Sequence, residues 1–311
     1  MTDAAKTTSR RWRGGREMAT TTTTKIGFVG LGHMGGSMAG RFLAAGYPVY
    51  GEEQSRAHAG ALIEEGLQWR ESPREVAETA DVVFTSLPDD GVLEAVASGA
   101  DGILAGLAAG KIWADMSTVS PAASRAIAER VRALGAAMLD APVSGSVPQV
   151  QAGTLTIMVG GDKDAYGRVE PLLRELGTPT HIGENGQGLV LKLAVNISLA
   201  VQMLAFAEGV LLAERAGVDR KLAVEVMTES AIGSPMLKAR AALVLELPEE
   251  AWFDVGLMQK DLVLALDTAR RLRVPLPSAA VADELLTVAR GLGYERRDLA
   301  ALFEVLAKLA G

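Results

Sequence analysis

From Gly186 to Gly217 the chain reads GQGLVLKLAVNISLAVQMLAFAEGVLLAERAG. This stretch contains no proline and few charges, and its apolar residues continue almost all the way round a helix, which predicts that the helix is buried. At about 1.5 Å per residue the helix would be roughly 45 Å long. Lys192 and Asn196 lie one turn apart on one face of its first turns. A lysine at the start of a buried helix suggests a function for that side chain.

The segments on either side of this helix differ in their periodicity. Before it, short apolar runs alternate with helical patterns of ten to fifteen residues, which is typical of βαβ units and a mainly parallel sheet. After it, only the helical period continues. We therefore predict an α/β fold, with a Rossmann-type doubly wound sheet over residues 25–186 and an all-α substrate and dimerisation domain over residues 187–311. The expected strands are residues 25–30, 48–51, 80–86, 110–115, 137–140 and 155–159.

The composition excludes several classes of protein. The net charge of −7 over 311 residues argues against general nucleic-acid binding, which requires a basic surface. The absence of cysteine excludes a disulfide framework, and with three histidines a metal site is not expected. Residues 193–207 form the longest uncharged run of the long helix, which is shorter than the ~20 residues of a membrane span. We expect a cytoplasmic protein without a membrane or nucleic-acid partner.

Residues 1–24 differ in composition from the rest of the chain. The arginine-rich segment RRWRGGR lies between small and polar residues, and no apolar run follows it, which argues against a secretory signal. Scarce acids and several arginines also resemble a transit peptide, and Met18 is an alternative start. The five threonines at residues 20–24 favour a disordered tail over residues 1–24.

A glycine loop, residues 30–35, follows the first predicted strand and opens a helix. Gly30, Gly32 and Gly35 form the pattern G-x-G-x-x-G, in which the glycines permit a tight turn, close approach of a pyrophosphate and close packing of the helix. The helix N-terminus then faces the phosphates. A tight βα turn without a ligand is the alternative interpretation. The intervening residues, which we assign to the cofactor site but not to catalysis, are Leu31, His33 and Met34.

The end of the second predicted strand indicates which dinucleotide binds. Glu53 lies there, and an acid at this position accepts hydrogen bonds from both ribose hydroxyls but repels a 2′-phosphate. The sequence therefore favours NAD. NADP is the alternative, because Arg56 lies nearby.

A second loop of small residues, D-A-P-V-S-G-S at residues 140–146, follows another predicted strand, where α/β domains bind ligands. Its backbone N–H groups and Ser144 are suited to holding an anion. Glycines 186 and 188 leave room beside Lys192. The alternative is that Lys192 extends to solvent and Asn196 is a polar position in the core.

Five motifs together resemble the β-hydroxyacid dehydrogenases, a family that includes 3-hydroxyisobutyrate dehydrogenase, tartronate semialdehyde reductase and the glyoxylate/succinic semialdehyde reductases. The resemblance covers about residues 25–308. The family usually has S-G-G where this chain has Ser144, Gly145 and Ser146, which leaves the substrate open. The motifs are GLGHMGGSMA, DMSTVSP, DAPVSGS, G-x-G-x-x-x-K-x-x-x-N and MQKDL.

The resemblance implies a role for each matching residue. Lys192 would be the catalytic acid/base, and Asn196 would help to hold the substrate. The substrate carboxylate would bind at Ser144 and Gly145, where Ser146 narrows the pocket or adds a hydrogen bond. The residues implied to line the cofactor, besides the glycine loop, are Leu87, Pro88, Thr118 and Lys260. Without the resemblance, Ser117 and Thr118 would be assigned to helix capping, and Lys260 with Asp261 to a solvated pair.

We therefore expect hydride transfer between NAD(P) and a short 3-hydroxy carboxylic acid or the matching semialdehyde. Burial and the positive nicotinamide would lower the pKa of Lys192 from about 10.4. The alternatives are an imine reductase-like NADPH enzyme, which would generally lack this lysine, and a catalytically silent binding module. The long helix, through Phe206 and Leu212, has more apolar surface than one short domain covers, which predicts a homodimer or homotetramer.

Overall fold

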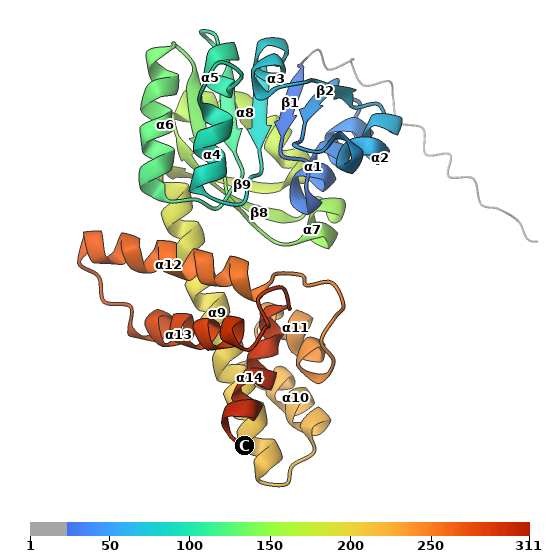
Figure 1. Cartoon of the computed structure of the whole chain (residues 1–311), viewed down its shortest axis with the longest axis vertical. Coiled ribbons are helices and arrows are strands. Elements are labelled where there is room, and N and C mark those ends of the chain that lie inside the picture. The colour runs from blue at the N-terminus through green and yellow to red at the C-terminus, as the bar shows by residue number, and fades with distance from the viewer. Residues whose placement is uncertain (1–23) are drawn as a thin grey trace, which may run out of the picture.

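The computed structural model describes residues 24–311. The predicted disordered tail, residues 1–24, lies outside the described residues except for Thr24. The described chain has an α/β part and an all-helical part, which are stacked along the long axis of the molecule and joined by the helix α9, Gln187–Arg215 (Figure 1).

The α/β part is built on one sheet. Its order is β3-β2-β1-β4-β5-β6-β8-β7, and β9 pairs with β8. The first six strands are parallel and follow the doubly wound order of a dinucleotide-binding domain. The strands are β1 (Ile26–Val29), β2 (Val49–Glu52), β3 (Gln68–Trp69), β4 (Val82–Thr85), β5 (Ile112–Asp115), β6 (Ala137–Asp140), β7 (Val143–Ser144), β8 (Leu155–Gly161) and β9 (Gly177–Gly183).

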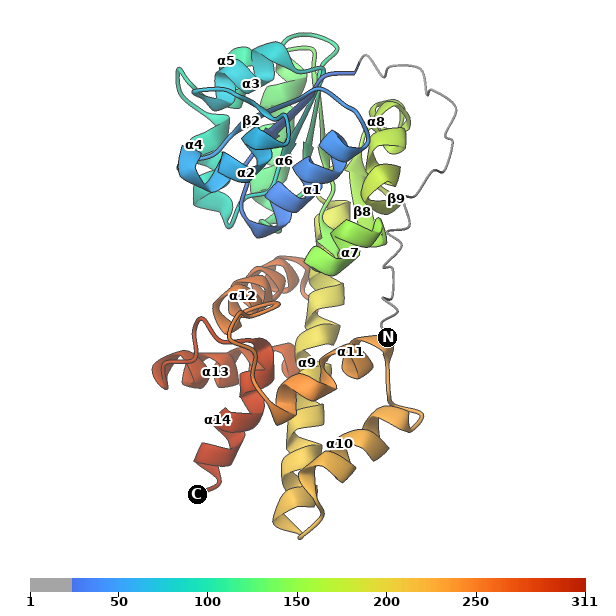
Figure 2. The ribbon, with the colours of Figure 1, turned by 90° about the vertical axis from the view of Figure 1, so that its right-hand side faces the viewer.

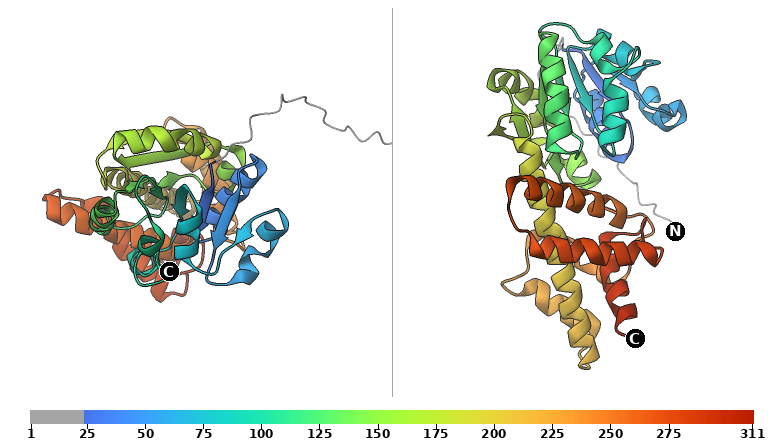
Figure 3. Two further views of the ribbon diagram at one scale, coloured as in Figure 1. Left: turned by 90° about the horizontal axis from the view of Figure 1, so that it is seen from above. Right: turned by 60° about the vertical axis from the view of Figure 1, so that its left-hand side comes forward.

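Helices cover both faces of this sheet, as Figure 3 shows from above. Alternate residues of the strands enter two separate cores, because successive strand side chains point to opposite faces. Phe28 and Phe84 stack with their ring centroids 6.0 Å apart in one core, whereas Val83 and Trp113 belong to the other. The helical elements here are α1 (His33–Ala44), η1 (Arg56–Ala59), α2 (Gly60–Glu64), α3 (Pro73–Thr79), α4 (Asp90–Ala97), α5 (Ile103–Gly106), α6 (Pro121–Ala133), α7 (Val147–Ala152) and α8 (Lys163–Leu176).

The all-helical part surrounds α9, which runs from the sheet through the whole of this part (Figure 2). Met203, Phe206 and Val210 of α9 lie in its core. The helix α12 crosses directly beneath the α/β part (Figures 1 and 2). The further elements are α10 (Arg220–Glu229), α11 (Pro235–Leu245), α12 (Val255–Leu272), α13 (Pro277–Gly291), η2 (Leu299–Ala301) and α14 (Leu302–Leu309).

The single chain covers only part of α9, although the apolar residues continue almost all the way round the helix. Leu191 is 40% exposed and Leu212 is 74% exposed, whereas Phe206 is covered by the chain itself. Within residues 24–311, α9 is also the one helix whose length and composition would allow it to cross a membrane. Core helices of soluble proteins have the same properties, and α10 to α14 pack against α9.

Several elements of the α/β part were not predicted. They are β3, α3, α4, α5, β7, α7 and β9. The sheet is also less uniform than expected, because β8 runs antiparallel to β6 and β7. Most of these elements have seven residues or fewer, and so short a segment does not display a full period of either regular pattern.

Candidate active site

The glycine loop has the geometry that a bound pyrophosphate requires. Gly30 adopts φ +85°, a left-handed conformation that favours glycine. A Cβ atom on Gly32 would meet no heavy atom within 4 Å, so the backbone is open to a ligand there. A Cβ atom on Gly35 would lie 2.0 Å from the Gly30 carbonyl oxygen, which shows how closely α1 packs on the turn. These residues therefore fit a dinucleotide cofactor.

The other residues of the glycine loop have distinct surroundings. Leu31 is buried, and Met34 packs against the core beside the sheet. His33 is exposed at the start of α1, where its carbonyl oxygen accepts a hydrogen bond from Ser37 Oγ at 2.7 Å. No contact of the His33 ring indicates a catalytic role.

Glu53 lies immediately after β2 and faces the glycine loop. Its Oε2 atom accepts a hydrogen bond from the Leu31 backbone N–H at 2.6 Å. Burial, with a smaller contribution from Glu53, raises the pKa of the neighbouring Glu52 to about 7. Two acidic groups thus lie at the end of β2, where the ribose of a dinucleotide binds in this fold.

The loops after β4 and β5 are joined through a serine. The Leu87 backbone N–H donates to Ser117 Oγ at 2.8 Å, and Ser117 Oγ donates to Asp115 Oδ1 at 2.5 Å. This hydrogen bond holds the two loops next to each other at one edge of the sheet. The loops contain Leu87, Pro88 and Thr118. The alternative reading of Ser117 and Thr118 as helix caps does not apply, because Ser120 caps α6 by accepting from the Ala123 N–H.

The predicted anion loop is shaped by Gly145 and Ser146. Gly145 adopts φ +133°, and a Cβ atom there would lie 2.7 Å from Leu155 Cδ2. The Ser146 hydroxyl and backbone N–H both donate to Gln149 Oε1, at 2.8 and 2.9 Å, at the start of α7. Ser144 belongs to β7, which lies beside α9. The hydroxyl of Ser146 thus has a local partner.

Lys192 belongs to a chain of polar contacts that connects both parts of the molecule. Its Nζ donates to Asn196 Oδ1 at 3.0 Å, and Asn196 Nδ2 donates to Asp261 Oδ2 at 2.5 Å. Lys260 Nζ lies 3.0 Å from Asp261 Oδ1, in an ion pair without the alignment of a hydrogen bond. Lys260 also donates to the Thr118 carbonyl oxygen, so α12 contacts the loop after β5.

Burial lowers the pKa of Lys192 to about 8. The Asp261 carboxylate opposes this effect, and the Lys260 ammonium adds to it. A lysine with this pKa changes its protonation state close to neutral pH, so it can both accept and donate a proton there. Within residues 24–311, no group of three or more acidic, histidine or cysteine side chains is arranged to hold a metal ion.

The structure brings several predicted residues together and leaves others apart. Lys192 is in direct contact with Asn196, and Lys260 with Thr118. The anion loop makes no hydrogen bond to Lys192. Asp261, which without the resemblance would be assigned to a solvated pair with Lys260, is instead buried and contacts both Asn196 and Lys260. The motif MQKDL contained this residue, but its spacing does not show what the carboxylate faces.

Comparison with known proteins agrees with this architecture. The family model described as the NAD binding domain of 6-phosphogluconate dehydrogenase matches residues 25–186, and the one described as NAD-binding of NADP-dependent 3-hydroxyisobutyrate dehydrogenase matches residues 186–306. The 2-(hydroxymethyl)glutarate dehydrogenase of Eubacterium barkeri is 35% identical, with 92% of this chain and 96% of that protein covered. The 2-hydroxy-3-oxopropionate reductase of Escherichia coli strain K12 is 35% identical over 92% of this chain and 98% of its own.

A solved structure agrees as well. That of Mycobacterium tuberculosis 3-hydroxyisobutyrate dehydrogenase with L-serine superposes with a TM-score of 0.81 at 30% identity, covering 92% of this chain and 99% of that one. The fold and the glycine loop define an NAD(P)-dependent oxidoreductase with a Rossmann-type domain and a helical domain. Within that class, the chain belongs to the β-hydroxyacid dehydrogenase family.

Proposed function

We propose that this chain transfers a hydride between NAD and a short 3-hydroxy carboxylic acid, or its semialdehyde, with Lys192 as the general acid/base. The observation that carries this proposal is the lysine itself: it is partly buried, its pKa is lowered to about 8, and Asn196 holds its ammonium group. The names of the relatives, which act on hydroxy acids and on 2-hydroxy-3-oxopropionate, support the substrate class.

Substrate binding is assigned to the loop that contains Ser144 and Gly145. Its backbone N–H groups and the Ser144 hydroxyl are donors suited to a carboxylate. The Ser146–Gln149 contact stiffens this loop from the side of α7. A substrate held here by its carboxylate would be limited in length by the distance to Lys192.

Proton transfer is assigned to Lys192. In oxidation, the neutral amine accepts the hydroxyl proton of the substrate; in reduction, the ammonium donates a proton to the carbonyl oxygen and polarises it. Bound NAD supplies the chemistry of hydride acceptance and donation at its nicotinamide. Asn196 takes one of the lysine's three N–H donors and leaves the others for the substrate oxygen. The glycine loop, Glu53, Leu87, Thr118 and Lys260 would hold the cofactor.

Lys192→Ala tests the assignment. We expect turnover with the best substrate to fall at least about 10²-fold, the lower range for loss of a general acid/base, while the Kd for NAD stays close to native. Lys221→Ala, which removes an exposed lysine of α10, is the matched control and should keep native turnover. Near-native turnover of Lys192→Ala would show that another group moves the proton.

The two rival functions can be separated by one assay. Neither an imine reductase-like enzyme nor a silent binding module accounts for Lys192 held by Asn196 and linked to Asp261. Cofactor oxidation and reduction should be followed with a panel of 3-hydroxy acids, semialdehydes and cyclic imines. Activity confined to imines, or no activity together with NAD binding, would favour the respective rival.

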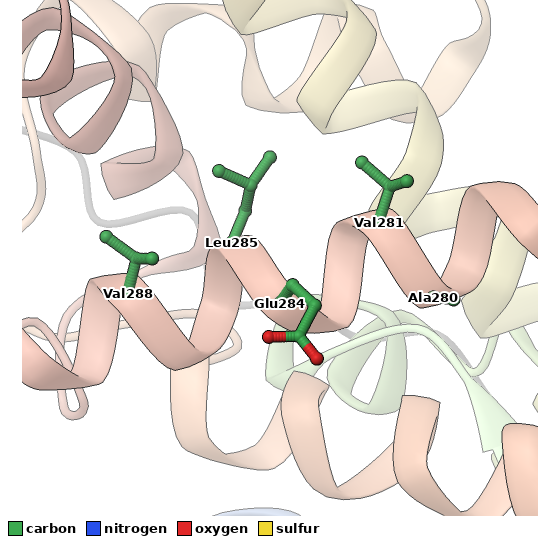
Figure 4. A pocket seen from close by; sticks show the side chains of 5 residues that line it. All are labelled: Ala280, Val281, Glu284, Leu285 and Val288. Atoms are coloured by element: carbon green, nitrogen blue, oxygen red, sulfur yellow. The ribbon is translucent and has the colours of Figure 1, made fainter.

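We also propose that the chain forms a homodimer or homotetramer through its helical part. A shallow apolar hollow on α13 is lined by Ala280, Val281, Glu284, Leu285 and Val288, and Figure 4 shows the two valines and Leu285 on one side of the helix with Glu284 turned away. Val281 is 57% exposed, and none of the predicted site residues lines this hollow. A monomer in solution scattering at micromolar concentration would contradict the proposal.

A further inference from the structure

Asp140 is a fully buried carboxylate that the proposed reaction does not use. It is the last residue of β6, and it reaches the start of α9 with both oxygens. Its Oδ1 accepts from the Gly186 backbone N–H at 2.6 Å, and its Oδ2 accepts from the Leu189 backbone N–H at 3.0 Å. One side chain therefore holds the first turn of α9 at two points.

Glycines enclose this carboxylate closely. A Cβ atom on Gly160 would lie 2.7 Å from each Asp140 oxygen, and one on Gly188 would lie 2.9 Å from Oδ2. Gly186 adopts φ +86°, which turns its N–H toward Asp140 at the helix start. The junction of β6, β8 and α9 therefore leaves no room for a methyl group beside the carboxylate. Close packing thus fixes the position of the Asp140 carboxylate.

The energetics favour a role in geometry over a role in stability. Burial raises the pKa of Asp140, and the N–H groups of Gly186 and Leu189 oppose that rise. Partial positive charge at a helix N-terminus further offsets the cost of burying an acid. Well-packed apolar groups commonly stabilise such a position equally well. What an apolar side chain cannot provide is a two-point hydrogen-bonded attachment of fixed length.

Lys192 follows Leu189 by three residues, or about 4.5 Å along the helix axis. The hydrogen bond from its ammonium to Asn196 lies within α9, so that bond by itself does not fix α9 relative to the sheet. We propose that Asp140 is a positioning residue for Lys192: it attaches α9 to β6 and thereby sets the reach of the lysine over the carboxyl edge of the sheet. This inference rests on the proposed acid/base role of Lys192.

Asp140→Asn tests the attachment with little change in shape. The new amide NH2 must face one of the two backbone N–H groups, so one of the two bonds is lost. We expect kcat, expressed per NAD-binding site, to fall about 10- to 100-fold, because misplacement of a catalytic group by about 1 Å has effects of this size. The Kd for NAD should change less than about threefold, since the glycine loop is untouched.

Asp219→Asn is the matched control. Asp219 caps α10 by accepting from the Leu222 N–H at 2.9 Å, so the same chemical change is made at a helix start that carries no proposed site residue. This variant should keep native kcat. The concentration of NAD-binding sites is measured by NAD titration of each purified variant. A loss of folded protein is then not mistaken for a loss of turnover.

Three outcomes overturn the inference. The first is a native kcat per site in Asp140→Asn, and the second is a loss of NAD affinity in this variant as large as its loss of kcat. The third is a shift in the midpoint of its pH–rate profile, which would mean that Asp140 acts by its charge. Asp140 is not among the charges that shift the pKa of Lys192. A native kcat of Asp140→Asn beside an inactive Lys192→Ala refutes only this inference, whereas an active Lys192→Ala refutes the proposed function.

If Asp140→Asn does not fold, Gly160→Ala perturbs the same attachment without removing the acid. Its methyl group would press on both Asp140 oxygens and on the Glu184 carbonyl oxygen just before α9. We expect the same fall in kcat per site with NAD binding retained. A folded Gly160→Ala variant with native kcat would overturn the inference.

Discussion

The charges of buried Asp261 and partly buried Lys260 should control the pH at which the enzyme works. Because the two charges have opposite signs, removing each of them should shift the pH dependence in opposite directions. The Asp261 carboxylate raises the pKa of Lys192, and the Lys260 ammonium lowers it. Asp261→Asn should therefore lower this pKa further, whereas Lys260→Met should raise it. Two substitutions at adjacent positions of α12 thus have opposite expected effects.

The structure sets the size of the effect in the native protein. The pKa of Lys192 lies at about 8 where an ordinary lysine has 10.5. Since each unit is tenfold, about 10% of the lysine is neutral at pH 7, which is ~300-fold more than for an unperturbed lysine. In the proposed mechanism oxidation uses the neutral amine of Lys192, so its rate should rise with pH to a plateau above pH 8, and reduction should show the opposite dependence.

The assay is kcat/KM for oxidation of the best hydroxy acid, measured at saturating NAD from pH 6 to pH 10. The midpoint of the rising limb should move to lower pH in Asp261→Asn and to higher pH in Lys260→Met. At pH 7, Asp261→Asn should consequently retain a larger fraction of its own plateau rate than the native enzyme does. Plateau rates of both variants are expected to fall, because Asn196 loses its carboxylate partner in Asp261→Asn and the proposed cofactor contact of Lys260 is lost in Lys260→Met.

Asp267→Asn is the control on the same helix. Asp267 is exposed and paired with Arg270 at 2.7 Å, so its replacement makes the same chemical change away from Lys192 and should not move the midpoint. The reasoning is refuted if Asp261→Asn and Lys260→Met shift the midpoint in the same direction, or if neither shifts it. Either result would mean that the limb reports a group other than Lys192.

Three further predictions concern Glu53 and Glu52 at the end of β2, and Ser146 in the predicted anion loop. Glu53→Ala should raise the Kd for NAD about tenfold, since the proposed charge-assisted hydrogen bond to the ribose is lost. The Kd for NADP should rise less, and fluorescence titration measures both values. An equal rise in the two Kd values would reject the proposed ribose contact. The pKa of Glu52 is raised to about 7 in the native state, so the native state keeps a proton that the unfolded state releases above pH 4.5. The free energy of unfolding therefore declines as the pH rises from 4.5 to 7. Glu52→Gln should therefore raise the Tm at pH 8 by about 2–4 °C and leave it unchanged near pH 4.5 in thermal denaturation. Ser146→Gly removes the hydrogen bond to Gln149 at the start of α7 and should raise the KM of the carboxylate substrate up to about fivefold, because a hydrogen bond contributes ~1 kcal/mol. Unchanged steady-state kinetics would exclude the loop from substrate binding.

Much of the fold could be predicted because its signals are local. The glycine loop lies between an apolar run and a helical pattern, and the structure confirms a strand at Ile26–Val29 and a helix from His33. Asp162, a residue type that commonly begins helices, caps α8 by accepting from the Ala165 N–H. Each of these features depends on residues within a few positions of one another, which is the range over which periodicity and capping rules act.

The contacts within the site were harder to predict from the sequence. Motifs contained Asp140 and Asp261, yet spacing alone assigned neither of them. Asp261 is 65 residues from Asn196, and Asp140 is 46 residues from Gly186. No local pattern encodes which of several acids will face a given amide or ammonium, because that depends on how α9 and α12 pack against the edge of the sheet.

The amino-acid sequence alone was enough to predict the two-part organisation, the dinucleotide loop and a lysine one turn before an asparagine on a long helix. These follow from hydrophobic period, glycine geometry and helical spacing, which are properties of contiguous residues. The packing of distant segments established that Asp261 and Lys260 act on the pKa of Lys192 with opposite signs and that Asp140 attaches the helix of Lys192 to β6. The reason is physical: the pKa and the reach of a side chain depend on burial and on neighbours in space, which arise only when distant segments pack together.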